Sequence, residues 1–559
     1  MNGHALTRTY DVLGRRTYRQ TPSGATSTLT YDERGLAAYA AGEQTFRFER
    51  DALGREVSRT LDDCLTLTQG WDSVGRVVAQ ALTTPNNTLF ERSFAYTPDG
   101  TPHTIEDSHT GRRTYTLDAA SRITAVTADG WSERYAYNTA GDQTHCALPP
   151  RAPGQDSTGE RTYSGSRVTQ AGRTRYEYDA QGRLTQRRVT TLSGKSLTWT
   201  FTWDAEDRLT HVHGPGEAAW RYFYDALGRR TAKHRLSADG RIEEVTTYCW
   251  DGGQLAEQHG NGVTLVWDYT GLHPLAQREF KADHTQKEID RRFFAIATDL
   301  TGAPSDLIAP DGTFAWHGRS TAWGATQSHR AATAYTPLRY PGQYFDPETG
   351  LHYNFNRYYD PELGRYITPD PLGLAPAANH YTYVPNPFTL ADPLGLAGCE
   401  ADPTWGGRVR FVRDEHGRPY EMHATITRDM LGEGTDANKS LRPPGFVHGT
   451  DHNQARGHML ANMLGGSGDT LDNLFTITQN PTNSPHMRDL EQSIHDAVKK
   501  DDGEIVQYSV YLEYTDSNKD SVPKWITMEA DGNKGFRLSA DLENRDHAAQ
   551  QIRRQRGIE

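Results

Sequence analysis

Segments with alternating apolar and polar residues follow one another through the first two thirds of the chain. TFRFER (residues 45–50) and RYAYN (residues 134–138) place every second side chain on one face, which is the period of a β-strand. An aromatic residue, then Asp or Asn, then a Gly turn recurs at a spacing of roughly 20 residues. Because Asp and Gly favour tight turns, each unit is predicted to be a strand–turn–strand hairpin that buries its apolar face by stacking on its neighbours.

These units resemble the RHS/YD repeats, and the resemblance extends from Thr9 to Leu396. The segment YPGQYFDPETGLHYNFNRYYDPELGRYITPDPLGL, residues 340–374, is similar to the C-terminal core of the same family. The resemblance implies a spiralling β-sheet that closes into a hollow, cocoon-like shell. The copies are YDVLGRR at Tyr10, YDERGL at Tyr31, RDALGRE at Arg50, WDSVGR at Trp71, LDAASR at Leu117, YNTAGD at Tyr137, YDAQGR at Tyr178, WDAEDR at Trp203 and YDALGRR at Tyr224.

From Ala397 the repeats stop and the pattern changes to that of an α+β domain. Residues 408–427 predict a β-hairpin that turns at Glu415–Gly417. Residues 484–500 have apolar positions at helical spacing, with Ser484 as the predicted N-cap. Further strands are predicted over residues 504–515 and 522–530, and a terminal helix over residues 544–559.

The pentapeptide DPLGL occurs twice before this change, beginning at Asp370 and at Asp392. Pro fixes φ and Gly permits positive φ, so a repeated structural turn is one interpretation. The other interpretation uses two neighbouring carboxylates, of which one keeps its proton, as the acid and base of a peptide hydrolysis. In RHS proteins this segment is the self-cleaving junction. The resemblance places the cut between Leu396 and Ala397, with Arg365 as an electrostatic helper.

Candidate chemistry in the tail lies between Arg442 and Glu491. The stretch holds an Arg-Gly-His at residues 456–458, a Gly-Gly-Ser-Gly loop, two Asn-containing segments and a Glu on the predicted helix. A GxSxG elbow, a lysine-containing phosphate loop and the zinc deaminase signature are absent from the sequence. An imidazole that takes a proton from water, beside a cation held by oxygen ligands, suits hydrolysis of a phosphodiester bond.

This pattern resembles the DNA/RNA non-specific endonucleases of the ββα-metal, or His-Me finger, class. The resemblance implies that His458 is the general base and that Arg456 binds the scissile phosphate. It also implies that Asn483 is a metal ligand and that Glu491 orients the metal-bound water. The expected cofactor is Mg²⁺ or another divalent cation such as Mn²⁺.

Three further residues complete the expected site. Asn473 is expected to brace the loop, and Asn480 is the second choice as metal ligand. The best-known relatives carry an Asp directly before the Arg, where this chain has Ala455. Asp451 or a backbone carbonyl is therefore expected to orient His458.

The sequence thus predicts a mainly β protein in three parts. Residues 1–335 form the RHS/YD-repeat β-shell, residues 336–396 the core-associated region with the self-cleavage junction, and residues 397–559 a smaller ββα-metal nuclease domain. A chain of 559 residues is too long for one hydrophobic core, which agrees with this division.

Composition excludes several classes of protein. The net charge of -12 argues against a generally basic nucleic-acid-binding protein. Residues 397–559 carry 19 Lys and Arg against 26 Asp and Glu, so a basic surface for nucleic acid has to be local. A run of roughly 18 apolar residues is absent, and a membrane span is not predicted. Four distant cysteines without a CxxC pair argue against a disulfide framework or a zinc ribbon.

The expected function is that of an antibacterial-type RHS toxin whose shell encloses a nuclease. The resemblance implies a DNA or RNA substrate, a cognate immunity protein, and secretion machinery or an N-terminal shell partner. It also implies a secreted effector, made in the bacterial cytoplasm and delivered into a target cell, commonly by type VI secretion. The alternatives are a non-enzymatic YD-repeat surface or adhesion protein, and a toxin with another C-terminal chemistry, ADP-ribosyl transfer or RNA-specific cleavage.

Overall fold

The computed structural model describes most of residues 5–545, and the chain divides into two compact units, Met1–Cys399 and Glu400–Glu559. Residues 336–396 belong to the first unit, and the three-part division remains a prediction. Ala397, Asp451 and most of the predicted terminal helix lie outside the described residues. The gaps within the described range are residues 13–14, 74, 98–99, 283–287, 374–376, 378, 397–408, 415–417, 440, 448–451, 469, 501–503, 517 and 519.

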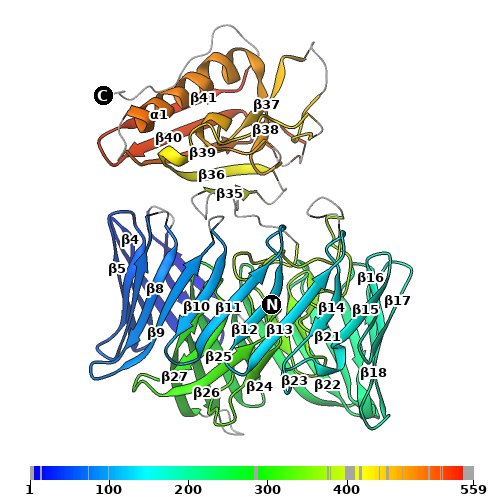
Figure 1. Ribbon diagram of the computed structural model, residues 1–559. Helices are drawn as coiled ribbons and strands as arrows, with labels where there is room; N and C mark the ends of the chain where they lie inside the picture. Colours follow the sequence, from blue (N-terminus) through cyan, green and yellow to red (C-terminus); the bar gives the residue numbers. More distant parts are fainter. Residues whose placement is uncertain are drawn as a thin grey trace. The chain divides into compact units, whose positions relative to one another are not determined.

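In its described part, the first unit is built around one antiparallel sheet in which each strand pairs with the next along the chain (Figure 1). The first ten strands are β1 (Thr7–Tyr10), β2 (Arg16–Gln20), β3 (Thr26–Asp32), β4 (Gly35–Ala41), β5 (Gln44–Arg50), β6 (Glu56–Leu61), β7 (Leu65–Trp71), β8 (Val77–Thr83), β9 (Thr88–Tyr96) and β10 (Pro102–Asp107). Then follow β11 (Gly111–Leu117), β12 (Ile123–Ala128), β13 (Trp131–Tyr137), β14 (Gln143–Ala147), β15 (Gly159–Ser164), β16 (Arg167–Ala171), β17 (Thr174–Tyr178), β18 (Leu184–Thr190), β19 (Ser196–Trp203) and β20 (Leu209–His213). The last are β21 (Ala219–Tyr224), β22 (Arg230–Leu236), β23 (Ile242–Asp251), β24 (Gln254–Gly260), β25 (Val263–Thr270), β26 (His273–Ala282), β27 (Glu288–Thr298), β28 (Pro304–Ile308), β29 (Phe314–Ser320) and β30 (Thr326–Ser328).

A clamp of one Asp and one Arg closes the repeated turn. Oδ1 of Asp72 accepts from the backbone N–H of Arg76 at 2.8 Å, and Oδ2 accepts from Nε at 2.7 Å. The Arg76 guanidinium lies 4.7 Å from the ring centroid of Tyr96, whose hydroxyl donates to the carbonyl of Val77. Each turn is thereby tied to the aromatic residue of the next. The same ion pair recurs as Asp11–Arg15, Asp51–Arg55, Asp118–Arg122, Asp179–Arg183, Asp204–Arg208 and Asp225–Arg229.

Buried charges join the first strands of the sheet to strands far along the chain. Asp268 on β25 is fully buried, and its carboxylate contacts Arg19 on β2 at 2.7 Å and Arg278 on β26 at 2.9 Å. Burial raises the pKa of Asp268, but the two guanidinium groups outweigh this effect and hold it below its ordinary value. The sheet therefore folds back on itself, with an apolar layer between β3–β9 and β26–β28.

The segment after the sheet fills the interior of this unit. It contains β31 (Tyr344–Asp346), β32 (Leu351–Asn354), β33 (Arg357–Asp360) and β34 (Arg365–Tyr366), a small antiparallel sheet whose residues are almost all buried. Asp346 is anchored to the surrounding sheet by Arg230 at 2.6 Å and by Lys233 at 3.0 Å.

The second unit has its own core between a five-stranded sheet and one helix (Figure 1). The sheet has the order β35 (Val409–Arg413), β36 (Pro419–Ile426), β39 (Val506–Glu513), β40 (Trp525–Gly532) and β41 (Arg537–Glu543). A separate hairpin, β37 (Gln454–His458) and β38 (Leu474–Thr478), continues through the irregular segment η7 (Gln479–Met487) into α1 (Arg488–Lys500). A hairpin followed by a helix is the ββα order that the sequence predicts.

The predicted helix begins later than expected. Ser484 has φ -140° and ψ 122°, the extended backbone that is usual for an N-cap residue, but regular α-helix begins only at Arg488. Ile494 and Val498 are buried on the predicted apolar face. The predicted fold class, a mainly β shell followed by a smaller α+β domain, is confirmed. The described helices include none that is long and apolar enough to cross a membrane.

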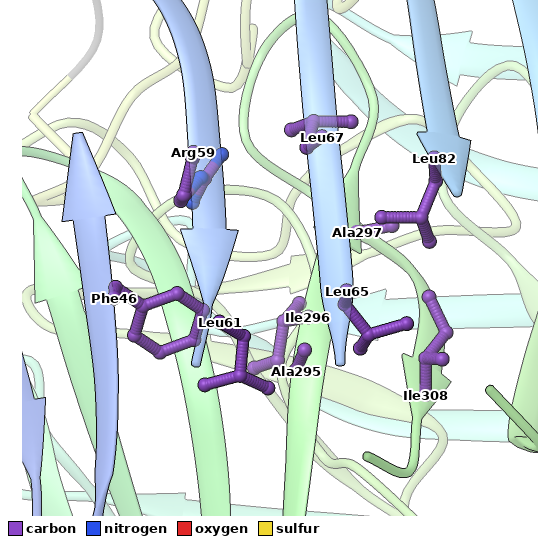
Figure 2. Close-up of a pocket in the computed structure, with 10 residues that line it drawn as sticks. All are labelled: Phe46, Arg59, Leu61, Leu65, Leu67, Leu82, Ala295, Ile296, Ala297 and Ile308. Atoms are coloured by element: carbon purple, nitrogen blue, oxygen red, sulfur yellow. The ribbon is translucent and has the colours of Figure 1, made fainter. Parts of the chain in front are cut away.

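Shortening Ile308 is expected to destabilise the first unit. Ile308 on β28 lines a cavity of about 30 Å³ with Phe46, Leu61 and Leu82 from the opposite layer (Figure 2). Ile308→Ala enlarges this cavity, at an expected cost of about 2–5 kcal/mol in the free energy of unfolding. Ile242→Ala, at a half-exposed position on β23, is the control and should change it by less than about 0.5 kcal/mol. Urea unfolding followed by tryptophan fluorescence measures both, and equal effects would contradict the packed layer.

Candidate functional site

His458 lies at the end of β37, where the strand pairs with Leu474 at the start of β38. Its Nε2 is 3.1 Å from the backbone carbonyl of Thr435. A carbonyl oxygen only accepts hydrogen bonds, so Nε2 carries the proton and Nδ1 keeps its lone pair. Burial lowers the pKa of His458, while the Thr435 carbonyl and the Asp436 carboxylate act in the opposite direction. The ring is therefore a neutral base at neutral pH.

Two loops pack against each other to place Thr435. The backbone N–H of Thr435 donates to the carbonyl of Gly466 at 3.0 Å, and the N–H of Gly468 donates to the Thr435 hydroxyl at 2.8 Å. A Cβ at Gly466 would lie 1.7 Å from the Leu460 carbonyl oxygen, and one at Gly468 would lie 2.1 Å from that of Asp436. The Gly-Gly-Ser-Gly stretch is therefore glycine-rich because the loops approach closely.

Arg456 lies two residues before His458 on the same strand, but its guanidinium is engaged with the protein. Nε donates to the carbonyl of Leu441 at 2.7 Å, and a terminal nitrogen donates to that of Lys439 at 2.9 Å. The group also lies 4.2 Å from the ring centroid of Phe446. These contacts fix the preceding loop, and the expected phosphate contact of Arg456 remains a prediction.

Asn473 is fully buried and joins the hairpin to its loop. Its Oδ1 accepts from the backbone N–H of Leu460 at 2.7 Å, and its Nδ2 donates to the carbonyls of Leu460 and Ser467 at 2.9 Å each. This is the geometry of a bracing residue. It fixes the chain directly after His458.

Asn483 and Asn480 both lie in η7, between the hairpin and the helix. Nδ2 of Asn483 is directed to Oε1 of Gln479 at 3.4 Å, which leaves Oδ1 as its free ligand atom in the described structure. Asn480 is tied through its backbone to Asn453 before β37, at 3.2 Å and 2.9 Å. These contacts do not involve the Asn480 side chain, so Asn480 stays the second choice as metal ligand.

Glu491 lies in the first turn of α1 and faces the core of the unit. Burial raises the pKa of Glu491 to about 8. The nearby hydroxyl of Tyr508 on β39 is buried and has no hydrogen-bond partner among the described residues. Both groups are thus short of polar contacts.

The donor set fits a divalent cation that is bound mostly through water. Among the described residues, no cluster of three or more His, Cys, Asp or Glu forms a full ligand cage. An amide oxygen at Asn483 and a buried carboxylate at Glu491 are hard oxygen donors, which suit Mg²⁺ and Mn²⁺ rather than a thiolate-binding metal.

The two aspartates of the DPLGL copies meet at one nitrogen. A terminal nitrogen of Arg357 on β33 lies 2.8 Å from Oδ2 of Asp370 and 3.3 Å from Oδ2 of Asp392. The hydroxyl of Tyr366 donates to Asp392 at 2.7 Å, and the Arg357 guanidinium lies 3.6 Å from the Tyr366 ring centroid. Burial raises the pKa of Asp370, and Asp392 adds to this effect, whereas Arg357 opposes it.

The chain that leads to the predicted cut is held by the same group of residues. Oδ1 of Asp392 accepts from the backbone N–H of Leu396 at 3.0 Å. The carbonyl of Leu394 accepts from the backbone and side chain of Asn356 at 3.2 Å and 2.9 Å. Nε of Arg357 donates to the carbonyl of Gly395. Leu396 is therefore fixed beside the aspartate pair.

The expected helper Arg365 interacts elsewhere. Its guanidinium pairs with Asp142 at 3.0 Å and donates to the carbonyl of Ser166, both in the surrounding sheet. Arg357 is the cation at the aspartates, and sequence reasoning missed it. Its only sequence signal is a cation in the aromatic segment NRYYD of the core region.

Comparison with known proteins gives the family of the first unit. Residues 5–243 and 285–389 match the family model of the teneurin YD-shell. The chain belongs to the teneurin YD-shell family. Residues 402–533 of this YD-shell protein match the family model of the DNA/RNA non-specific endonucleases. The prediction that RHS/YD repeats are followed by an endonuclease-like domain is confirmed. The endonuclease family generally depends on a divalent metal.

Curated relatives of the YD-shell protein include two probable deoxyribonucleases of Dickeya dadantii. RhsA is 30% identical over 88% of this chain and 32% of the relative. RhsB is 33% identical over 71% of this chain and 28% of the relative. The double-stranded DNA deaminase toxin A of Burkholderia cenocepacia is 36% identical over 63% of this chain and 26% of the relative. The YD-shell protein thus spans about a third of these relatives or less. The match to RhsA is longer than the first unit, so it extends into the second.

Solved structures support the fold of the first unit. The crystal structure of TcdB2-TccC3-TEV aligns with a TM-score of 0.51 at 19% identity, over 70% of this chain and 21% of that chain. At this identity, the likeness concerns the fold alone.

Glu491→Gln is expected to remove a pH-dependent loss of stability from the second unit. The pKa of Glu491 is raised from 4.5 to about 8 in the folded state, so the folded protein keeps a proton that the unfolded chain releases. The contribution of Glu491 to the free energy of unfolding is therefore greatest below pH 4.5 and falls as the pH rises to about 8. The test measures the rate of amide hydrogen exchange in β39, in EDTA and corrected for the intrinsic rate. Between pH 4.5 and about 8 this rate should rise in the parent protein, and it should rise less in the variant.

Glu529→Gln, an exposed position on β40, is the control for this experiment and should follow the parent protein. An unchanged pH dependence in Glu491→Gln would show that Glu491 is already ionised in the folded unit.

Proposed function

We propose that the second unit is a metal-dependent endonuclease that hydrolyses phosphodiester bonds in DNA, and also in RNA. The observation that carries this proposal is the neutral His458 at the end of the ββα hairpin, with Nε2 bound to a carbonyl and Nδ1 free. The endonuclease family match over residues 402–533 and the deoxyribonuclease names of two relatives support it.

In the proposed reaction, Nδ1 of His458 takes a proton from a water molecule, whose oxygen attacks the phosphorus. Asn483 offers Oδ1 to a divalent cation, Mg²⁺ or Mn²⁺, and Glu491 orients water beside it. The cation would stabilise the charge of the pentavalent phosphorus and of the departing oxygen. Arg456 contributes positive charge near the phosphate, because residues two apart on a strand lie on the same face as each other. Asn473 keeps the chain after His458 in place.

We infer further that the first unit cuts its own chain after Leu396. Asp370 and Asp392 share one Arg357 nitrogen, and the pKa of Asp370 is raised, which suits one protonated and one ionised carboxyl group. Asp392 also accepts from the Leu396 N–H, so its carboxyl group contacts the residue on the amino side of the proposed cut. Cleavage at this bond would break the covalent link between the nuclease and the shell.

These two activities together describe an antibacterial-type toxin of the RHS class. The relatives named as deoxyribonuclease and toxin support this setting. An immunity protein would protect the producing cell, and a secretion system would deliver the effector from the bacterial cytoplasm into a target cell. An N-terminal shell partner remains part of the proposal.

Purified protein is expected to degrade plasmid DNA and RNA with Mg²⁺ and not with EDTA. His458→Ala should lower the rate by about 10²- to 10⁴-fold, because it removes the general base. His495→Ala is the matched control, since this His lies on α1 and contacts only Gln492 and Asp496 in the described structure. Full activity of His458→Ala would contradict the proposal that His458 is the general base. Intact DNA beside degraded RNA would favour an RNA-specific enzyme, and consumption of NAD an ADP-ribosyltransferase.

The parent chain is expected to appear as two fragments on a denaturing gel, divided after Leu396 by mass spectrometry. Asp370→Asn and Asp392→Asn keep the size of the side chain but remove the acid or the base, so each should leave one band. The control variant Asp239→Asn, at an exposed turn, should be cleaved into the same two fragments as the parent protein. Normal cleavage in both junction variants would contradict the aspartate assignment.

A further inference from the structure

The loop before β37 brings a carboxylate to His458 that the Arg-Gly-His motif does not contain. Asp436 follows Thr435, the residue whose carbonyl accepts the Nε2 proton of His458. Oδ1 of Asp436 accepts from Nδ2 of Asn462 at 2.7 Å. Burial lowers the pKa of His458, and the Asp436 carboxylate acts in the opposite direction.

The backbone on both sides of Asp436 is fixed. On one side, Thr435 is bonded to Gly466 and Gly468. On the other side, the N–H of Asn438 donates to the carbonyl of Gly468 at 2.9 Å. Asp436 is therefore an exposed residue that is held in one place by two loops and by Asn462.

We propose that Asp436 is a positioning residue for His458: held by Asn462, it keeps the Thr435 carbonyl against Nε2 and faces the positive charge that develops on the ring. This inference rests on the proposed function, in which His458 accepts a proton. A base in a partly buried site resists becoming charged, and a fixed carboxylate offsets that resistance without touching the substrate.

Two other ionisable side chains of the proposed site are occupied or neutral. The Arg456 guanidinium, on the same strand, is directed to the carbonyls of Lys439 and Leu441. Glu491, whose pKa is raised to about 8, is protonated at neutral pH in the absence of metal. Asp436 is thus the described group that can supply negative charge to the imidazolium.

Asp436→Asn tests the charge, because an Asn side chain still offers one oxygen to Asn462. In the full-length protein with saturating Mg²⁺, the acid limb of the kcat–pH profile should move to lower pH by about half a unit. That is less than the one to three units that a carboxylate in direct contact produces. The value of kcat should fall with KM unchanged, and Asp436→Glu should restore most of it. Glu529→Gln, on the exposed sheet face, should leave the profile as in the parent.

A second readout does not depend on catalysis. In metal-free protein, the pH dependence of diethyl pyrocarbonate labelling of His458, followed by mass spectrometry, should shift in the same direction in Asp436→Asn. Asn462→Ala frees the carboxylate but keeps its charge, so it should give a smaller shift.

The outcomes separate this inference from the proposed function. An equal loss of activity at every pH, with the labelling curve unmoved, would mean that Asp436 only supports the loop, and the inference would be wrong. If His458→Ala is inactive while Asp436→Asn matches the parent, only this inference fails. If His458→Ala remains active, the proposed function itself fails.

Discussion

A guanidinium group removed from water needs partners for its charge, and at several places in the first unit the partner is an aspartate from a distant segment. Arg19 meets Asp268, Arg230 meets Asp346, and each pair joins segments far apart in the sequence. Removing one partner would leave an uncompensated buried charge, which destabilises a protein by several kcal/mol, on the order of 3–5. The interior segment and the surrounding sheet therefore fix each other. The junction uses the same chemistry, with Arg357 between two carboxylates.

In the second unit, burial acts on two groups in opposite directions. It lowers the pKa of His458 and raises that of Glu491. Both side chains are consequently uncharged near neutral pH in the metal-free protein. For both groups burial is the largest cause, so the packing of the core sets the two protonation states.

The sequence allowed the fold class to be predicted because its information was local. The repeated Asp–Arg turns, the alternating strands and the apolar face of α1 all depend on residues within a few positions of one another. Long-range partners were not predictable in this way. Arg357 reaches Asp370 and Asp392 only through the folded core, and Arg365 contacts Asp142 more than 200 residues earlier. The sequence predicted that Asp451 or a backbone carbonyl orients His458, but it did not identify Thr435. Contacts between loops have no fixed spacing in the sequence from which a partner could be predicted.

The turn clamp has a consequence for how such a protein can be made and altered. Each clamp uses its own Asp and Arg and one ring from the following turn, so it closes as soon as roughly 20 more residues have left the ribosome. The Asp–Arg pair recurs in the second unit as Asp414 and Arg418, but the ring beside it, Tyr514 at 4.0 Å, comes from a segment much further along the chain. A gene can therefore gain or lose whole repeats without rewriting the others, and the number of repeats becomes a property that evolution adjusts separately from the sequence of the second unit.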